Sequence, residues 1–462
     1  MELIHKFSID DLKYVLDVNT GSIMEIDQIV YDLLEDSRVL SLDEAKEKYS
    51  DKYTEEEIKE VLSEIDNLIK DGILYTRDMY EEKVKFNNQQ EYMKAMCLNV
   101  VHDCNLKCKY CFADEGEYKG KREIMSFEVA KAALDFLISQ SGPRYNIEVD
   151  LFGGEPLMAF GMIKQLVEYA RSIEKKVNKN IRFTLTTNGT LLNDEIIEYL
   201  NENMKNIILS IDGRKEVNDN MRLTARGTGS YDLIIDKIKK LVDNRKEGQE
   251  YYVRGTYTHQ NLDFSNDFLH LANQGFKEIS LEPVVVKDNA EIAIEFDDLE
   301  QIYSEYDKIY KYLTEMIDQG KKINFYHYNI NLQGGPCVYK RVSACGAGFE
   351  YIAITPSGDI YPCHQFVGRK EFVLGNIHEL GNKIRNEELV QEFQDANIYK
   401  KEDCNKCWAR FYCSGGCQAN NQEFTNSILK PYKIGCHLQK KRIEMAIALK
   451  VYEKTRGNLV NN

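Results

Sequence analysis

Residues 95–286 alternate between short apolar runs and longer amphipathic stretches, and this alternation constrains the fold more than any other feature of the chain. The short runs predict buried strands and the amphipathic stretches predict helices. Six such strands in series favour a partial (β/α)6 TIM-like barrel, an α/β fold with right-handed crossovers and its chemistry at the carboxyl ends of the strands. The expected strands are Ala95–Val101, Ile147–Phe152, Ile181–Thr186, Asn206–Ile211, Tyr252–Thr258 and Glu278–Glu282, and the expected helices are Phe127–Ile138, Met162–Val177, one from near Asp194, Tyr231–Asn244 and Asp267–Asn273.

Three cysteines, Cys104, Cys108 and Cys111, follow the first expected strand with the spacing C-x3-C-x2-C. Three thiolates from one tight loop can hold three irons of a [4Fe–4S] cluster and leave the fourth iron open to a small chelating ligand. A structural zinc site would normally need a fourth protein ligand nearby. A loop in which the cysteines fall together by chance is the alternative that this stretch leaves open.

Polar motifs also follow the next three expected strands. Gly153-Gly154-Glu155-Pro156 follows the second strand, residues 186–190 (Thr-Thr-Asn-Gly-Thr) follow the third, and residues 210–213 (Ser-Ile-Asp-Gly) end the fourth. Each motif alone is explained equally well by a turn. Because the carboxyl ends of parallel strands meet at one rim, all four segments together favour a functional site there.

A second group of cysteines occupies the last third of the chain: Cys337, Cys345, Cys363, Cys404, Cys407, Cys413, Cys417 and Cys436. The central spacing C-x2-C-x5-C-x3-C is also compatible with a zinc knuckle. Iron–sulfur clusters are favoured over zinc, because the chain already carries a predicted cluster loop and iron–sulfur clusters can transfer electrons.

The composition restricts location and partners. Twelve cysteines without a secretory signal at the start of the sequence favour a reduced, cytoplasmic chain. The formal net charge of -15 argues against nucleic acid as the main partner. No apolar run of about 18 residues occurs, so no membrane span is expected.

Residues 1–85 contain none of these cysteines and predict a small winged-helix-like module. Its elements are strands at Lys6–Leu16 and Ile23–Ile26 around a turn at 19–21, a short helix at Ile29–Leu34, and a longer helix at Thr54–Ile69 with a capping box from Thr54 and Glu57. Such a module is either a packing appendage or an element that captures a peptide at an open sheet edge.

These readings divide the chain into consecutive parts. They are the N-terminal module 1–85, a polar linker 86–94, the barrel 95–286, a helical linker 287–336, a cysteine-rich domain 337–440, and a C-terminal helix and tail 441–462.

Taken together, the sequence resembles the radical S-adenosylmethionine (SAM) superfamily, in its subgroup with a C-terminal SPASM domain. The signature C-x3-C-x-aromatic-C is matched by Cys104, Cys108, Tyr110 and Cys111, and the seven-cysteine SPASM pattern is matched from Cys345 to Cys436. The order of module, barrel and SPASM domain, with residues 111–116 after the signature, resembles the maturases of SCIFF peptides, which form thioether crosslinks.

The resemblance implies that the open iron of the cluster at Cys104, Cys108 and Cys111 chelates SAM. It also implies a set of SAM-binding residues: Glu155 and the Gly154 carbonyl at the ammonium, Ser210 and Asp212 at the ribose or methionyl end, Arg222 at the carboxylate, Tyr110 beside the adenine, and Asn188 in the same pocket.

The resemblance further implies three [4Fe–4S] clusters in all. Cys345, Cys363 and Cys417 would hold the first auxiliary cluster, and Cys404, Cys407, Cys413 and Cys436 the second. Since only seven cysteines fit the pattern, we expect one position on the first auxiliary cluster to be open to a substrate thiolate. Cys337 is the alternative fourth ligand.

The implied function is a radical SAM maturase that forms cysteine thioether crosslinks in a ribosomally made precursor peptide through a 5′-deoxyadenosyl radical. The N-terminal module would bind the leader of that peptide, and a ferredoxin or flavodoxin would donate electrons. The alternatives are a SPASM dehydrogenase similar to the sulfatase maturases and, outside the enzymes, a zinc-binding scaffold protein.

Overall fold

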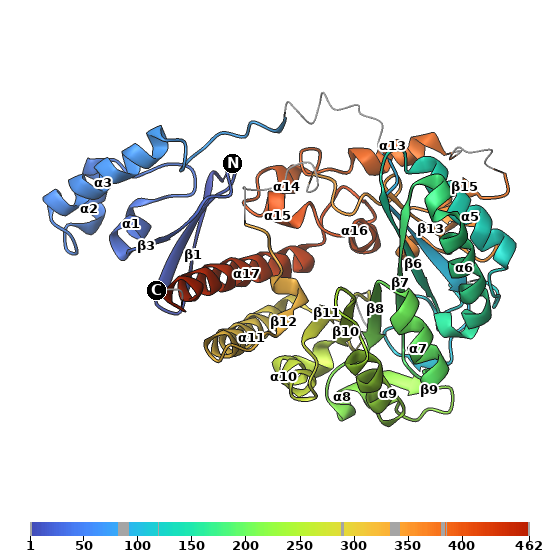
Figure 1. The fold of residues 1–462 in the computed structure, drawn as a ribbon. Helices are drawn as coiled ribbons and strands as arrows, with labels where there is room; N and C mark the ends of the chain where they lie inside the picture. The colour runs from blue at the N-terminus through green and yellow to red at the C-terminus, as the bar shows by residue number, and fades with distance from the viewer. Residues whose placement is uncertain are drawn as a thin grey trace. The chain divides into compact units, whose positions relative to one another are not determined.

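The computed structural model describes residues 2–81, 92–118, 120–287, 291–332, 342–379, 384 and 386–460. The chain forms two compact units (Figure 1). The first comprises Met1–Gln89, Tyr328–Ala344 and Ala396–Asn462, and the second comprises Gln90–His327 and Cys345–Asp395. Within the described residues, no helix is both long and apolar enough to cross a membrane.

The second unit is built on a ten-stranded sheet with the order β12-β11-β10-β8-β7-β6-β4-β13-β14-β15. The six predicted strands are confirmed, each within two residues of its expected bounds: β4 (Ala95–Val101), β6 (Asn146–Gly153), β7 (Asn180–Thr187), β8 (Asn206–Ser210), β10 (Glu250–Tyr257) and β11 (Glu278–Pro283). They pair in parallel, which confirms the α/β barrel-type sheet.

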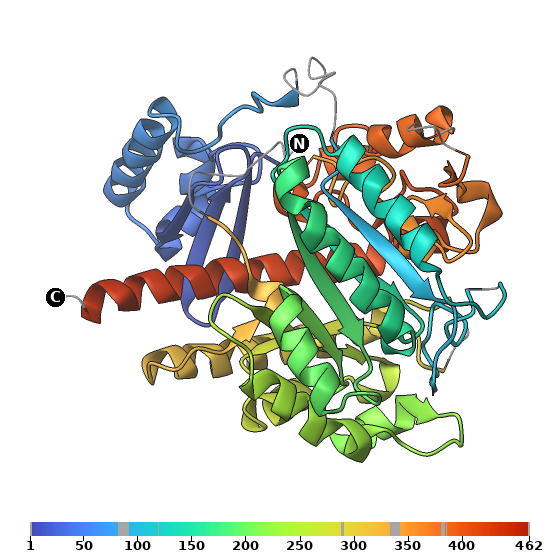
Figure 2. The same ribbon diagram turned by 45° about the vertical axis from the view of Figure 1, so that its right-hand side comes forward.

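Helices alternate with these strands (Figure 2). They are α5 (Phe127–Gln140), α6 (Phe160–Val177), α7 (Asp194–Asn203), α8 (Lys215–Met221), α9 (Tyr231–Asp243), α10 (Ser265–Asn273) and α11 (Leu299–Asp318). The strands show why the helices cover one face: in β6, Ile147, Val149 and Leu151 are fully buried, whereas the alternating residues Glu148, Asp150 and Phe152 are partly exposed. The apolar side chains of the strand therefore point toward the helices, and the alternating side chains point to the opposite, inner face of the sheet.

Part of the predicted cysteine-rich domain belongs to this sheet. β13 (Tyr351–Ile354) pairs in parallel with β4, and β14 (Asp359–Tyr361) and β15 (Gly375–Asn376) continue the sheet antiparallel. Residues 345–395 thus join the barrel unit, whereas residues 396–462 join the N-terminal module. Strands this short carry too few residues for a periodic pattern, so the sequence did not reveal them.

Smaller elements complete the second unit. The short strands are β5 (Leu106–Cys108), β9 (Arg222–Thr224) and β12 (Asn324–Phe325), and α13 (Glu387–Asp395) is a further helix. The 3-10 helices along the chain are η1 (Pro156–Ala159), η2 (His259–Asn261), η3 (Phe296–Asp298), η4 (Tyr326–Tyr328), η5 (His364–Phe366) and η6 (Lys370–Phe372).

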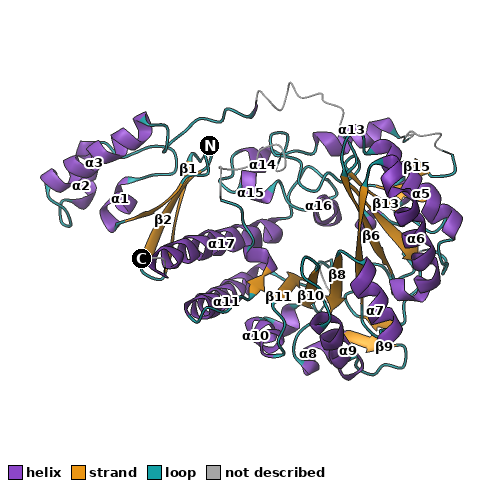
Figure 3. Cartoon of the chain, viewed as in Figure 1, coloured by secondary structure: helices purple, strands orange, loops and turns teal. Residues whose placement is uncertain are grey.

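The N-terminal module of the first unit is a three-stranded antiparallel sheet with three helices (Figure 3). Its elements are β1 (Ile4–Ile9), β2 (Leu12–Asp17), β3 (Ile23–Ile26), α1 (Gln28–Leu33), α2 (Leu42–Tyr49) and α3 (Glu55–Lys70). The capping box of Thr54 and Glu57 is confirmed. The interpretation of Lys6–Leu16 as one strand was wrong, because the chain turns at Asp10, which has a φ of 51°. Helix α2 was not predicted.

The C-terminal part of the first unit is helical: α14 (Glu402–Asn405), α15 (Arg410–Cys413), α16 (Gln418–Thr425) and α17 (Lys433–Val460). Helix α17 begins before the predicted residue 441 and therefore includes Cys436. The predicted ligands of the second auxiliary cluster and the N-terminal module accordingly lie in one compact unit.

Candidate active site

A two-stranded sheet holds the first cysteine loop at the carboxyl end of β4. β5 pairs antiparallel with β9, which places Cys108 opposite Arg222. The loop is further closed by a hydrogen bond from the Cys111 amide to the Cys108 carbonyl at 3.1 Å, and the Leu106 amide points to Cys104 Sγ at 3.5 Å. The pairing brings Arg222 next to the loop that carries Cys104, Cys108 and Cys111. The sequence placed these four residues in one site.

The surroundings of these thiols fit an iron cluster. Burial raises the pKa of Cys104 to about 12 and that of Cys108 to about 11, and Arg222 opposes the rise at Cys108. Metal ligation requires the thiolate, and a bound cation supplies the charge that makes the thiolate favourable. Cys104 and Cys108 would therefore ligate a metal as thiolates only with the charge of a bound cation beside them.

The Gly153-Gly154-Glu155 motif lies against the backbone of the cysteine loop. A Cβ on Gly154 would stand 1.9 Å from the Asp103 carbonyl oxygen, and Gly153 has a φ of 136°. The Gly154 amide donates to Val101 O and the Glu155 amide to Asp103 O, both at 2.9 Å. Only glycine permits this approach to the loop, because any Cβ at position 154 would overlap the Asp103 carbonyl.

Glu155 is completely buried and joins two strand ends. Its carboxylate accepts hydrogen bonds from the Leu157 amide at 3.0 Å, the Thr187 hydroxyl at 2.8 Å and the Asn188 amide at 2.8 Å. Burial raises its pKa, and these donors oppose the rise. A carboxylate offers about four acceptor positions, so one more donor, such as an ammonium group, can still be accepted.

Asn188 lies beside the cysteine loop. Its Nδ2 donates to Asn105 Oδ1 at 2.9 Å and is 3.8 Å from Cys104 Sγ, while its Oδ1 accepts from the Thr190 hydroxyl at 2.6 Å. Asn105 donates to Thr190 in turn, at 2.7 Å. Asn105 and Thr190 were not predicted as site residues, although both stand within motifs that the sequence singled out.

Tyr110, Asp212 and Arg222 form one buried group. The Tyr110 hydroxyl donates to the Asp212 carboxylate at 2.7 Å, and Arg222 Nη1 donates to the same hydroxyl at 2.7 Å. Asp212 also accepts from the Thr256 amide at 3.0 Å. Burial raises the pKa of Asp212 to about 6, and Arg222 opposes the rise. Tyr110, expected beside an adenine, thus has a structural partner on each side, while the buried Arg222 Nε lacks one among the described residues.

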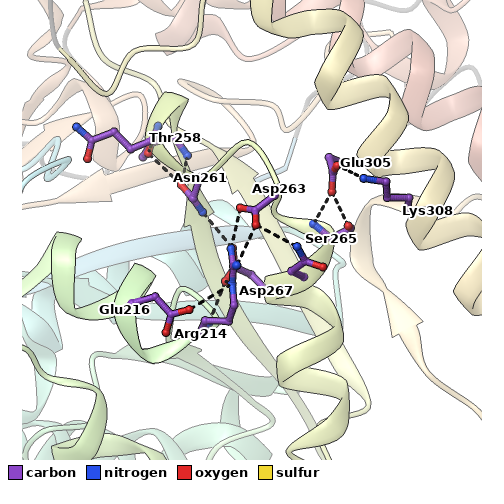
Figure 4. Close-up of polar contacts among 11 residues, drawn as sticks. Arg214, Glu216, Thr258, Asn261, Asp263, Ser265, Asp267, Glu305 and Lys308 are labelled. Carbon is purple, nitrogen blue, oxygen red and sulfur yellow. Dashed lines mark hydrogen bonds and ion pairs between the residues drawn. The ribbon is translucent and has the colours of Figure 1, made fainter.

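A salt-bridge network fixes the chain directly after Asp212 (Figure 4). Arg214 binds Asp263 through Nη2 at 2.7 Å and the fully buried Asp267 through Nε at 2.8 Å. Gly213 has a φ of 119°, and a Cβ there would stand 2.3 Å from Asp267 Cβ. Ser210, the last residue of β8, precedes this turn. The network holds Asp212 toward Tyr110, and no local pattern in the sequence predicted it.

The cysteines of the SPASM region divide between the two units. Cys345 and Cys363 lie in the second unit. The ring centroids of His364 and Phe112, the residues that follow Cys363 and Cys111, are 5.6 Å apart, so Cys363 lies near the rim that carries Cys111. Cys417 lies in the first unit, and the set proposed for the first auxiliary cluster remains a prediction. Cys337 lies outside the described residues.

Cys404, Cys407, Cys413 and Cys436 all lie in the first unit. Burial raises the pKa of Cys404 to about 12, and the neighbouring Cys413, Cys436 and Cys407 add to the rise, which places the four thiols in one neighbourhood. No group of three or more Cys, His, Asp or Glu side chains in the described part of the chain is arranged to hold a single metal ion. The assignment of ligands to clusters therefore also remains a prediction here.

Asp150 was not predicted as a site residue. It lies on the inner face of β6, where its carboxylate accepts a hydrogen bond from the Tyr351 hydroxyl at 3.2 Å. Burial, followed by the charge of Glu148, raises its pKa to about 7. The alternation of Glu148, Asp150 and Phe152 with apolar residues was the signal that could have found it.

Comparison with known families defines the class. Residues 98–263 match the Radical SAM superfamily, and residues 345–408 match SPASM, an iron-sulfur cluster-binding domain. The chain is therefore an enzyme that carries a radical SAM domain and a SPASM domain. This class replaces the alternative of a zinc-binding scaffold protein.

Two relatives illustrate the range of the class. The chain is 24% identical to the radical SAM cyclopropyl synthase TigE of Paramaledivibacter caminithermalis, over 92% of this chain and 90% of TigE. It is 26% identical to a cysteine-type anaerobic sulfatase-maturating enzyme of Clostridium novyi, over 69% of this chain and 86% of that enzyme.

Two solved structures share the fold. The first is anSMEcpe with bound AdoMet and the Cp18Cys peptide, with a TM-score of 0.64 and 22% identity over 79% of this chain and 99% of that chain. The second is Streptococcus suis SuiB bound to its precursor peptide SuiA, with a TM-score of 0.52 and 18% identity over 93% of this chain and 97% of that chain.

Gly154→Ala tests whether the close contact between the glycine motif and the cysteine loop positions that loop. The added methyl group would overlap the Asp103 carbonyl, so the loop must move. We expect the anaerobically reconstituted variant to lose the iron of one cluster, about four irons per chain. Gly161→Ala is the matched control, because a Cβ there meets no atom within 4 Å. Full iron content in Gly154→Ala would show that cluster binding does not need this contact.

Asp150→Asn tests the raised pKa of the buried Asp150 carboxyl. The fold favours the protonated form, so the stability from this group is complete below a pH of about 4 and is lost as the pH rises through about 7. Relative to wild type, the variant should gain about 2–3 kcal/mol of unfolding free energy between pH 5 and pH 8. Anaerobic denaturation at both pH values measures this gain, with Asp243→Asn, an exposed carboxylate, as the control. An equal difference from wild type at the two values would refute the shift.

Proposed function

We propose that this enzyme is a maturase of a ribosomally made precursor peptide and forms thioether crosslinks from its cysteines. The observation that carries the proposal is the N-terminal module with an open sheet edge. Within the described residues, β3 pairs only with β2, so its other edge is available to an added strand. A peptide bound in this way gains main-chain hydrogen bonds along the strand.

Partly buried apolar side chains pack against the module core, two of them on β3 itself. Met24 and Ile26 on β3, with Val61, Leu62 and Ile69 on α3, pack against the core without being fully enclosed by it. Such side chains offer apolar contacts to a strand that docks on β3. The similarity to SuiB, which covers 93% of this chain and was solved with a precursor peptide, supports the same reading.

The barrel residues fit binding of SAM beside a cluster. Cys104, Cys108 and Cys111 would hold the iron cluster, and Glu155 would accept from the SAM ammonium through its remaining acceptor position. Arg222, with its unpartnered Nε, would donate to the SAM carboxylate. Ser210, Asp212 and Asn188 would line the same pocket. When bound, the cluster and SAM supply the radical chemistry that removes a hydrogen atom from the substrate.

The chain itself orients this chemistry. The Tyr110–Asp212–Arg222 group and the Arg214 network fix the rim side chains before the cofactor binds, so little reorganisation is needed. Cys345, Cys363 and Cys417 would hold the first auxiliary cluster, with an open position for the substrate thiolate, and Cys404, Cys407, Cys413 and Cys436 would hold the second. A ferredoxin or flavodoxin would supply electrons.

The second candidate is a SPASM dehydrogenase similar to the sulfatase maturases. The match to the Clostridium novyi enzyme favours it, although that match covers only 69% of this chain. The N-terminal module discriminates between the candidates, because a leader-binding element serves a precursor peptide.

Mass spectrometry tests the proposal. A cysteine-rich precursor encoded beside the enzyme should lose two hydrogen atoms, about 2 Da, for each crosslink after anaerobic incubation with SAM and reductant. The crosslinked cysteines should also resist alkylation. Cys104→Ala is the matched control and should leave the precursor unchanged. A precursor that stays unmodified, together with modification of a sulfatase peptide, would support the second candidate instead.

A further inference from the structure

The loop that carries three predicted ligands of the second auxiliary cluster contacts the N-terminal module. We call residues 404–413 the cluster-II loop. Trp408, directly after Cys407, is 3% exposed, and its indole stacks on the His5 imidazole with ring centroids 3.7 Å apart and planes 4° apart. The Trp408 amide also donates to Glu2 Oε2 at 2.7 Å. Two residues at the start of the module thus hold the residue that follows a predicted ligand.

The same histidine reaches the helix that carries the fourth predicted ligand. His5 Nε2 lies 2.8 Å from Glu444 Oε1 on α17, the helix that includes Cys436. His5 is also part of an aromatic row, because Phe7 stacks next to it at 5.6 Å. Strand β1 therefore bridges both elements that bear the proposed ligands.

Arg410 makes a second connection from inside the cluster-II loop. Its side chain is completely buried, and Nη2 donates to Asn19 Oδ1, in the turn between β2 and β3, at 2.6 Å. Nη1 donates to the carbonyl of Cys407 at 3.2 Å, and Nη2 lies 3.7 Å from Asp78 Oδ2. One guanidinium thus joins a predicted ligand's own backbone to the module.

The cluster-II loop has little stability of its own. Its helices α14 and α15 have four residues each, too few to be stable in isolation. Ligand binding to such a loop contributes its free energy to folding. Whatever stabilises the loop should also stabilise the module seated on it.

We propose that Trp408 and Arg410 couple metal ligation at Cys404, Cys407, Cys413 and Cys436 to the seating of the N-terminal module. The second auxiliary cluster then has an architectural function, because leader-peptide binding depends on it. The leader-binding half of this proposal rests on the proposed function, whereas the coupling itself does not.

Trp408 is the single tryptophan of the chain, so its fluorescence reports on this contact directly. In full-length, anaerobically reconstituted protein, Cys413→Ala should shift the Trp408 emission to longer wavelength and increase quenching by acrylamide. Leader-peptide affinity should fall about tenfold. Cys97→Ala, which changes a buried cysteine of β4 that belongs to none of the predicted ligand sets, is the matched control and should change none of these. Loss of iron in Cys413→Ala with unchanged emission and quenching would overturn the coupling.

A variant on the module side keeps the test decisive if Cys413→Ala does not fold. His5→Ala should accelerate iron release to a chelator about threefold to tenfold, since it removes one aromatic contact and one hydrogen bond. Glu47→Ala, an exposed residue of α2, is its control. An unchanged release rate in His5→Ala would refute the coupling. If the wild-type protein binds no leader peptide, the proposed function fails, while emission and iron release still decide the coupling.

Discussion

The approach of Gly154 to the Asp103 carbonyl sets the position of the first cysteine loop, and much of the site depends on it. From this point the Glu155 carboxylate ties the turn after β6 to the end of β7. Asn188 then extends the contact to Asn105 and toward Cys104. The chain therefore fixes its cysteine loop through contacts with neighbouring strands.

A second set of contacts fixes the opposite side of the loop. β9 aligns Arg222 with Cys108, and the Tyr110 hydroxyl links Arg222 to Asp212. Behind Asp212, Arg214 is held by two carboxylates. Charged groups that would be costly to bury alone are paired here, and the pairing leaves Glu155 and Arg222 with capacity for a ligand that carries both an ammonium and a carboxylate.

The sequence predicted the elements well where a local pattern decides them. The strand bounds of the barrel, the capping box at Thr54 and the recurrence of polar motifs at one rim all depend on spacing within a few residues. The sequence did not reveal which residues contact the side chains of the site. Tyr110 contacts Asp212 and His5 contacts Trp408 across 102 and 403 residues respectively, and such pairings depend on tertiary packing. The same reason explains why the predicted cysteine-rich domain is shared between two compact units, and why β13, with four residues, was missed.

The pairing with β13 makes β4 an interior strand of the sheet and not an edge strand. Strand β4 leads directly into the first cysteine loop, and without β13 it would end the sheet with unpaired amides and carbonyls along an apolar, fully buried segment. Exposed strands of that kind recruit other chains. A barrel separated from residues 345–395 would therefore be prone to aggregate through the strand that supports its chemistry. Residues 345–395 of the SPASM region thus protect the edge of the barrel sheet. The barrel and this part of the SPASM region are therefore not structurally independent.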